Sequence, residues 1–331
     1  MVEKIYYFIA NGVNPYENLA VEEILLDQVQ PGECILYLWQ NQNTVVIGRN
    51  QNCWKECKVN ELEESGGFLA RRLSGGGAVY HDLGNLNFTF LTTEQDYSVE
   101  KQLFVIQKAV EKFGITVEKS GRNDLTVKGR KFSGNAFYRS RGKCYHHGTI
   151  LISTDEKMME NFLNVDPSKL KSKGVDSVRS RVGNLCEYSS EISVGSTMQN
   201  LIFAFSDVYQ KCPKRILSEE LPGGQVQLMR EKYESWEWKY GKKIDFTHQF
   251  TKRFSWGSIE FQIQVDQGRI QSVNVFSDGL DSRFYCLETY LVNTKYERKE
   301  ILNTLKNSME KQEFENSVIQ DILELVRQNI E

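Results

Sequence analysis

The chain has 331 residues, of which 40% are hydrophobic and 26% are charged, a mixture typical of globular proteins. The formal net charge of −3 gives no general basic surface and argues against nucleic acid as a partner. No apolar run is long enough to cross a bilayer, and residues 1–10 lack the pattern of a signal peptide, so we expect a cytoplasmic protein that makes no contact with a membrane. Seven cysteines in so long a chain favour reduced thiols over a disulfide scaffold.

Up to about Gly241, short strand-like runs alternate with helices and glycine-rich loops. A helix is predicted to begin at Asn14-Pro15, a pair typical of a helix start, and another covers Val99 to Phe113, where apolar residues recur at helical spacing. Short runs rich in β-branched or aromatic residues predict strands at residues 5–9, 34–39, 44–47, 88–90 and 147–152.

The last part of the chain has a simpler pattern. Residues 259–265 alternate strictly between apolar and polar, as a half-buried strand does, and a turn at residues 266–268 leads to a partner strand at residues 270–276. Two helices follow, near residues 299–309 and 314–330.

The chain length is that of about two domains. The change of pattern places a first domain of mixed sheets and helices at residues 1–243 and a smaller α+β domain at residues 244–331. The predicted fold class is therefore α+β.

The first segment that carries chemistry is Arg71 to His81, in which two arginines precede the consecutive glycines 75–77. Consecutive glycines let a backbone approach a ligand closely and turn its N–H groups inward, and arginine supplies fixed positive charge. The pattern suits a phosphate or a carboxylate, although it matches neither the P-loop nor the dinucleotide-binding consensus. A flexible loop with two solvated arginines is an equally good interpretation of the pattern alone.

The second segment is Ser120 to Asn135, where a hairpin is predicted around Gly129. Asn123 and Asp124 come before the turn, and Lys131 comes after it, next to the small residues 133–134. A lysine beside small residues is free to point into a cleft. A hairpin tip with solvated cations is the commoner case.

The third segment contains His146 and His147, which are predicted to lie on a strand. Neighbouring residues of a strand point to opposite faces, so these two side chains are not expected to hold one metal ion together. We expect one of them to line a pocket and the other to lie in the core or at the surface. The fourth segment, Lys171 to Leu185, holds two lysines and two arginines. It is interpreted either as a loop that folds over a negative ligand or as an exposed basic loop.

Taken together, five motifs in this order resemble those of the lipoate–protein ligase A family. They are RRLSGGGAVYHDLGN at 71–85, GRNDL at 121–125, RKFSG at 130–134, HHGT at 146–149 and KGVDSVRSRV at 173–182. The likeness extends from about Asn14 through the C-terminal domain. An ordered set of five motifs is far more specific than any single glycine loop.

The resemblance implies a biotin-ligase-like catalytic domain followed by a C-terminal accessory domain. The implied enzyme activates lipoate with ATP and Mg²⁺ to lipoyl-adenylate, and then transfers the lipoyl group to a lysine of a carrier protein. The implied carriers are the lipoyl domains of 2-oxoacid dehydrogenase E2 subunits and the glycine-cleavage H protein.

By position in the motifs, Lys131 is the implied catalytic lysine, which touches both the lipoyl carbonyl and the α-phosphate. Asp124 is expected to orient or deprotonate the attacking amine of the carrier. No residue is assigned to a metal. The residues implied to bind lipoate, ATP or the adenylate are Arg72, Gly75, Gly76, Gly77, Ala78, Val79, Tyr80, Asn123, Lys131, His147, Lys173, Arg179 and Arg181.

Two other functions are compatible with parts of the sequence. One is an ATP-independent octanoyl or lipoyl transferase that uses a cysteine thioester, because Cys144 and Cys186 lie near the motifs. The other is a non-catalytic protein that binds lipoate or a nucleotide. The C-terminal domain and the complete basic segment favour the ATP-using enzyme over both. The preferred carrier, the use of octanoate and the oligomeric state are left open.

Overall fold

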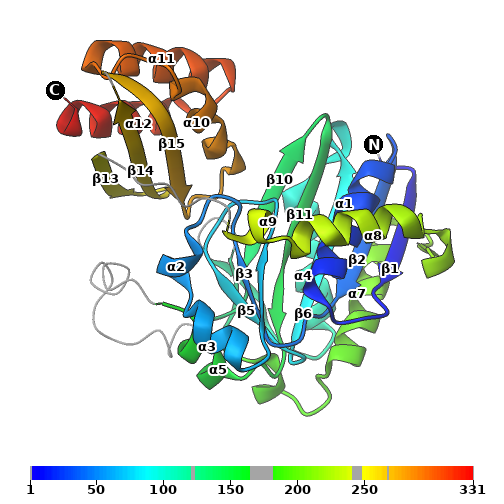
Figure 1. Ribbon diagram of the computed structural model, residues 1–331. Coiled ribbons are helices and arrows are strands. Elements are labelled where there is room, and N and C mark those ends of the chain that lie inside the picture. Colours follow the sequence, from blue (N-terminus) through cyan, green and yellow to red (C-terminus); the bar gives the residue numbers. More distant parts are fainter. Residues whose placement is uncertain (1, 121–123, 165–181, 241–247, 267, 331) are drawn as a thin grey trace. The chain divides into compact units, whose positions relative to one another are not determined.

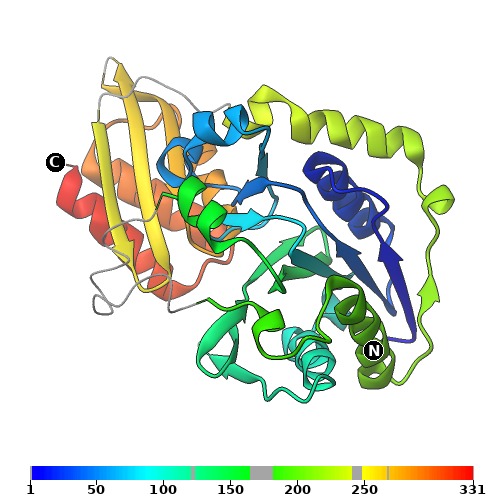
Figure 2. The same ribbon diagram turned by 90° about the horizontal axis from the view of Figure 1, so that it is seen from below.

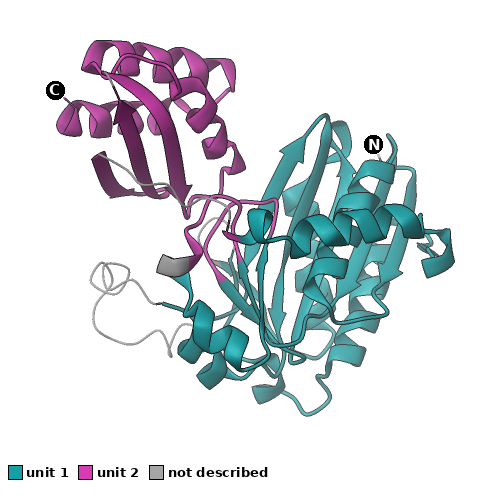
Figure 3. Ribbon diagram, viewed as in Figure 1, with its two compact units in different colours: residues 1–46, 54–71, 79–239 teal, residues 47–53, 72–78, 240–331 magenta. Residues whose placement is uncertain are grey.

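The computed structural model describes residues 2–120, 124–164, 182–240, 248–266 and 268–330 (Figure 1). The chain forms two compact units (Figure 3). The first unit contains residues 1–46, 54–71 and 79–239, and the second contains residues 47–53, 72–78 and 240–331. The predicted domain boundary after residue 243 falls outside the described residues and stays a prediction.

The first unit is built on a six-stranded mixed sheet. Its strands are β1 (Lys4–Ile9), β2 (Glu33–Trp39), β6 (Asn85–Thr93), β10 (Asn135–Ser140), β11 (Lys143–Leu151) and β12 (Lys214–Arg215). Their order across the sheet is β10-β11-β6-β2-β1-β12. β1 runs parallel to β2 and to β12, and the remaining pairs are antiparallel.

Helices cover both faces of this sheet. They are α1 (Pro15–Gln28), α4 (Val99–Glu111), α7 (Val194–Tyr209) and α8 (Gly223–Glu234). Figure 2 shows α1 and α8 on one side of the sheet and α4 and α7 on the other. The predicted start of α1 is confirmed, because the Asn14 side chain caps the helix by accepting from the backbone N–H groups of Tyr16 at 2.9 Å and Glu17 at 3.2 Å.

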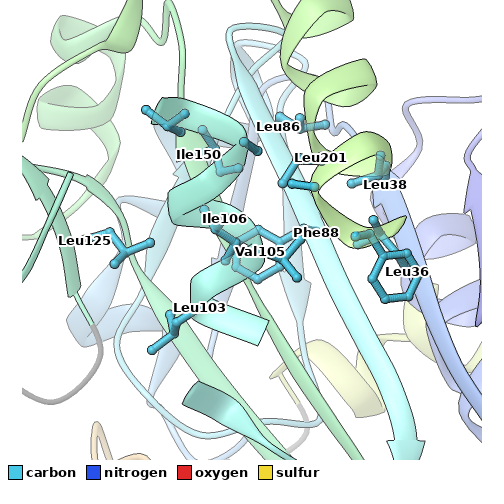
Figure 4. Packing of buried hydrophobic residues seen from close by; sticks show 14 of the residues in the cluster. Leu36, Leu38, Leu86, Phe88, Leu103, Val105, Ile106, Leu125, Ile150 and Leu201 are labelled. Carbon is cyan, nitrogen blue, oxygen red and sulfur yellow. The ribbon is translucent and has the colours of Figure 1, made fainter. Parts of the chain in front are cut away.

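The core of the first unit follows from the alternation of side chains along the strands. Leu36 and Leu38 of β2 join Phe88 of β6 and Leu201 of α7 in one buried cluster (Figure 4), whereas Tyr37 points to α1. All nine residues of β6 are buried. Full burial of a side chain such as Phe88 stabilises the fold by about 1.5–3 kcal/mol.

Two small sheets and several short segments complete the first unit and its junctions with the second. The sheets are formed by β3 (Thr44–Ile47), β4 (Phe68–Arg71) and β5 (Val79–His81), and by β7 (Glu118–Ser120), β8 (Asp124–Val127) and β9 (Arg130–Ser133). The short helices are α2 (Cys53–Glu56), α3 (Val59–Glu64), α5 (Glu156–Phe162), α9 (Trp236–Tyr240), η1 (Glu94–Asp96), η3 (Leu185–Glu187) and η4 (Ser218–Glu220).

The second unit contains a three-stranded antiparallel sheet that packs against helices around its own apolar core. The strands are β13 (His248–Phe254), β14 (Gly257–Asp266) and β15 (Arg269–Ser277), and the helices are η5 (Ser282–Tyr285), α10 (Cys286–Leu291), α11 (Arg298–Lys311) and α12 (Asn316–Asn329). The predicted hairpin and the two predicted helices are confirmed, and so is the α+β class. Across the described ranges, no helix has the length and apolar character needed to span a membrane.

His146 occupies a fully buried position between β11 and α4. Its Nε2 lies 2.8 Å from Asn135 Oδ1, and its Nδ1 lies 3.2 Å from Gln102 Oε1. Burial lowers the pKa of His146 to about 3, because a charged imidazolium would lose its hydration there. The imidazole is therefore neutral in the folded protein at pH 7.

We predict that His146 makes the fold sensitive to acid. Between pH 6.5 and about 3 the unfolded chain binds a proton at His146 that the folded protein does not, so stability falls as the pH falls through this window. From about pH 7 to about pH 5 this contribution amounts to about 2 kcal/mol. Urea unfolding of the wild type and of His146→Phe at both pH values measures it. Equal losses of unfolding free energy in the two proteins contradict the prediction.

Candidate active site

The predicted lysine and aspartate form an ion pair between neighbouring strands of the sheet made by β7, β8 and β9. Lys131 on β9 and Asp124 on β8 meet with Nζ and Oδ1 2.8 Å apart, and their side chains stay 37% and 42% exposed. A Cβ atom placed on Gly134 would lie 3.1 Å from Lys131 Nζ and Cε, so the end of the lysine lies over this glycine. A pair this exposed adds little to stability, and both groups remain accessible to a ligand.

The two histidines point to opposite faces of the sheet, as the strand periodicity predicts. His146 faces α4, whereas His147 faces α1, where its Nδ1 lies 2.8 Å from Glu22 Oε1. Both side chains are buried. Over the part of the chain that the structure describes, no group of three or more His, Cys, Asp or Glu residues is arranged to hold a metal ion.

Sequence reasoning missed a buried polar network around His147. Thr89 of β6 donates its hydroxyl to Glu22 Oε1 at 2.7 Å, and Trp39 of β2 donates its indole N–H to Thr89 Oγ1 at 3.1 Å. A buried carboxylate is costly unless such donors surround it. The available signal was the position of Glu22 in α1, three residues after Leu19 and four before Leu26, both of which are buried.

The three consecutive glycines of the second unit occupy three different environments. A Cβ on Gly75 would lie 2.5 Å from the carbonyl oxygen of Gly279, which leaves no room for a side chain. Gly76 has φ of +91° and donates its N–H to Gly279 O at 2.7 Å. A Cβ on Gly77 would meet no protein atom within 4 Å, so the backbone there is open.

Arg71 and Arg72 are both buried, so the interpretation of this segment as a loop with solvated arginines is wrong. Arg72 donates to Ser74 Oγ at 3.0 Å and to the carbonyl oxygens of Gly75 at 2.7 Å and Gly77 at 2.8 Å. Its guanidinium thereby holds the glycine loop in shape. Within the first unit, Arg71 donates to the carbonyl oxygens of residues 238–239.

The residues that follow the glycine loop lead into β5. Ala78 and Val79 are partly exposed, whereas the Tyr80 ring is buried and its hydroxyl donates to Asn43 Oδ1 at 3.2 Å. Burial, reinforced by the negative charge of Asp82, raises the pKa of Tyr80 to about 12, so the phenol remains protonated at pH 7. Asn123, Lys173, Arg179 and Arg181 lie outside the described residues, and the structure leaves their predicted roles as predictions.

Comparison with known proteins identifies both parts of the chain. Residues 14–206 match the family described as Lipoyl protein ligase A/B catalytic domain, and residues 243–326 match the Bacterial lipoate protein ligase C-terminus family. The Lipoate-protein ligase A of Psychrobacter cryohalolentis is 40% identical over 297 residues, which cover 87% of this chain and 88% of that protein.

Two solved structures agree with these matches. The structure of P. falciparum LipL1 in complex with lipoate has a TM-score of 0.81 at 29% identity, and the match covers 97% of this chain and 99% of that one. A structure of lipoate-protein ligase A bound with ATP has a TM-score of 0.62 at 25% identity, over 73% of this chain and 99% of that one.

Fold and matched domains together define an α+β ligase with a separate C-terminal domain. The chain belongs to the lipoate–protein ligase A family.

The surroundings of Gly75 and Gly77 predict that the same substitution, glycine to alanine, affects stability at one position and not at the other. Gly75→Ala forces a methyl group against the Gly279 carbonyl and should lower the unfolding free energy by about 1–3 kcal/mol. Gly77→Ala meets open space and should leave the melting temperature within about 2 °C of the wild type. If a ligand approaches the open backbone, Gly77→Ala loses activity while it stays folded. Indistinguishable melting temperatures for the two variants contradict the packing argument.

Proposed function

We propose that this ligase activates lipoate with ATP to lipoyl-adenylate and then transfers the lipoyl group to a lysine of a carrier protein. The proposal rests mainly on the Lys131–Asp124 pair, an accessible cation and carboxylate on the strands of the family's catalytic domain. The ATP-bound relative supports the use of ATP.

In the first step, a carboxylate oxygen of lipoate attacks the α-phosphorus of ATP. A new phosphorus–oxygen bond forms, the α–β anhydride bond breaks, and pyrophosphate leaves with the bonding electrons. Both reactants are anions, so we assign Lys131 to neutralise the carboxylate and the α-phosphate as they meet. ATP is proposed to enter as its Mg²⁺ complex, since Mg²⁺ takes many of its ligands from phosphates and water.

In the second step, the amine of the carrier lysine attacks the lipoyl carbonyl carbon of the adenylate. The amide bond forms, AMP leaves, and the amine gives up a proton. Asp124 is proposed to orient the amine or to accept this proton, since its Oδ1 lies 2.8 Å from Nζ of Lys131, which we assign to the same carbonyl.

The remaining predicted residues are assigned to binding. The open backbone at Gly77, together with Gly75, Gly76, Ala78, Val79 and Tyr80, is proposed to contact the nucleotide, with Arg72 holding the loop in shape. His147, oriented by Glu22, is proposed to line the lipoate pocket. Asn123, Lys173, Arg179 and Arg181 are proposed to bind the adenylate.

We propose the lipoyl domains of 2-oxoacid dehydrogenase E2 subunits and the glycine-cleavage H protein as carriers, and the cytoplasm as the compartment. Free thiols at Cys34, Cys144, Cys186, Cys212 and Cys286 are compatible with reducing surroundings. They also bear on the thioester alternative. Cys144 is buried, and burial raises the pKa of its thiol, which disfavours the thiolate that a thioester mechanism needs.

We predict that modification of the carrier depends on ATP. With lipoate, Mg-ATP and a purified lipoyl domain, intact-mass measurement should show one added lipoyl group, accompanied by release of pyrophosphate and AMP. Omitting ATP should abolish the mass gain, because the carboxylate is then never activated. Transfer at an equal rate from an octanoyl-carrier donor without nucleotide establishes the acyltransferase instead.

Lys131→Ala should lower the rate of adenylate formation by about 10²–10³-fold, because one charge that stabilises the transition state is removed. The melting temperature should change little, since the side chain is partly exposed. Lipoate-dependent exchange of radioactive pyrophosphate into ATP measures the step. Lys119→Ala on β7 of the same small sheet is the matched control, because Lys119 is exposed and lies outside the five motifs. Equal rates in both variants remove Lys131 from the catalytic role.

A further inference from the structure

The strand that carries Lys131 has a partner on each side. On one side β9 pairs with β8, with Lys131 opposite Thr126. On the other side Val182 forms a one-residue parallel bridge to Lys131, and the N–H of Gly183 donates to the Lys131 carbonyl oxygen at 3.0 Å. A bridge of a single residue provides little holding energy of its own, so other contacts must keep Val182 and Gly183 in place.

The side chain of Arg130, the residue before the catalytic lysine, makes those contacts. Its Nε donates to the Val182 carbonyl oxygen at 2.9 Å. Its two terminal nitrogens reach Glu187 Oε2 at 2.5 Å and Glu156 Oε1 at 3.6 Å. The guanidinium thus ties β9 to the start of α5 and to both ends of the stretch 182–187. A planar fork with several N–H donors suits this task, and a lysine has no equivalent geometry.

Gly183 makes room for this arrangement. A Cβ on Gly183 would lie 2.9 Å from Arg130 Cζ and Nε, so a side chain there would displace the guanidinium. Within the same stretch, the side chain of Asn184 exchanges two hydrogen bonds with the backbone of Thr154, at 2.8 Å and 3.0 Å. The hydrogen bonds of Asn184 therefore fix the stretch to Thr154, and the contacts of Arg130 hold it beside β9.

We propose that Arg130 is a positioning residue for Lys131: it holds Val182 and Gly183 along β9 and so fixes the backbone from which the lysine reaches Asp124. This inference rests on the proposed role of Lys131 in adenylate formation. We call the contacts of Arg130 with Val182, Glu187 and Glu156 the clamp. A displacement of about 1 Å in a catalytic group lowers the rate about 10²-fold, so loss of the clamp should lower kcat.

The experiment compares Arg130→Gln, which removes the charge and the fork, with Gly183→Ala, which leaves Arg130 in the chain but displaces its guanidinium. Arg139→Gln is the matched control, since Arg139 pairs with Glu94 at 2.7 Å in an exposed contact on β10. Lipoate-dependent pyrophosphate exchange gives kcat and KM, and hydrogen exchange reports on the Gly183 amide. Melting temperature checks the fold, and Glu187→Gln serves as a milder variant if Arg130→Gln does not fold.

Both clamp variants should lose about 10- to 100-fold in kcat, with KM for lipoate changed less than about threefold, because the binding contacts remain. The amide of residue 183, after correction for the intrinsic rate of alanine in Gly183→Ala, should exchange at least about tenfold faster than in the wild type, and Arg139→Gln should match the wild type throughout. An unchanged kcat overturns the inference. So does a lower kcat with unchanged exchange at Gly183, or a rise in KM alone, because Arg130 would then act on the substrate directly.

Failure of the proposed function is a separate result. It appears as absence of lipoate-dependent pyrophosphate exchange in the wild type. Unchanged protection of the amide of residue 183 in Arg130→Gln and Gly183→Ala then still rules out the clamp.

Discussion

The first unit depends on one strand, β6, that is buried along its whole length. A strand enclosed on both faces needs partners within the protein for the polar groups it carries, because water is excluded. Phe88 and Phe90 supply apolar packing on one face, and Thr89 points to the other, where it links Trp39 and Glu22. The neighbouring strand β11 then completes the network with His147. A network of this kind holds its side chains in one arrangement, since any rotation leaves a buried donor or acceptor without a partner.

The glycine loop shows a different use of the backbone. The guanidinium of Arg72 lies inside the loop, where it donates hydrogen bonds to the carbonyl oxygens of Gly75 and Gly77. Carbonyl oxygens drawn toward a guanidinium leave the N–H groups of the loop to face other directions. Close packing requires glycine at position 75, and a positive φ favours it at position 76. At Gly77, by contrast, no protein atom lies close enough to exclude a side chain. A missing side chain with no protein neighbour is what close approach of a ligand requires.

The proposed catalytic pair and the arginine that supports it differ in their contacts. Lys131 and Asp124 are partly exposed and add little to stability, which leaves their charges available to a substrate. Arg130 on the same strand engages three partners at once, so its interactions are structural in character. Adjacent residues of a strand point to opposite faces, and this allows one residue to meet the substrate while the next secures the backbone.

The sequence by itself determined the local elements and the family. The Asn14-Pro15 pair predicted the start of α1, and the apolar–polar alternation of residues 259–265 predicted the hairpin of the second unit, because each signal lies within a few consecutive residues. The order of the motifs identified the family, and the position of Lys131 in them is the basis for proposing it as the catalytic lysine. Sequence reasoning did not predict α7, α8 or the network around Glu22, and it left the state of Arg71 and Arg72 open.

Tertiary structure decided what each side chain touches. Glu22 and His147 are separated by 125 residues, and Arg130 and Val182 by 52, so no local pattern relates them. The glycines at 75 and 77 are identical as residues, and their surroundings alone distinguish a packing role from an open one. The physical reason is the same in each case: periodicity records which face of an element is apolar, but hydrogen bonds and steric contacts depend on which distant segment packs against that face.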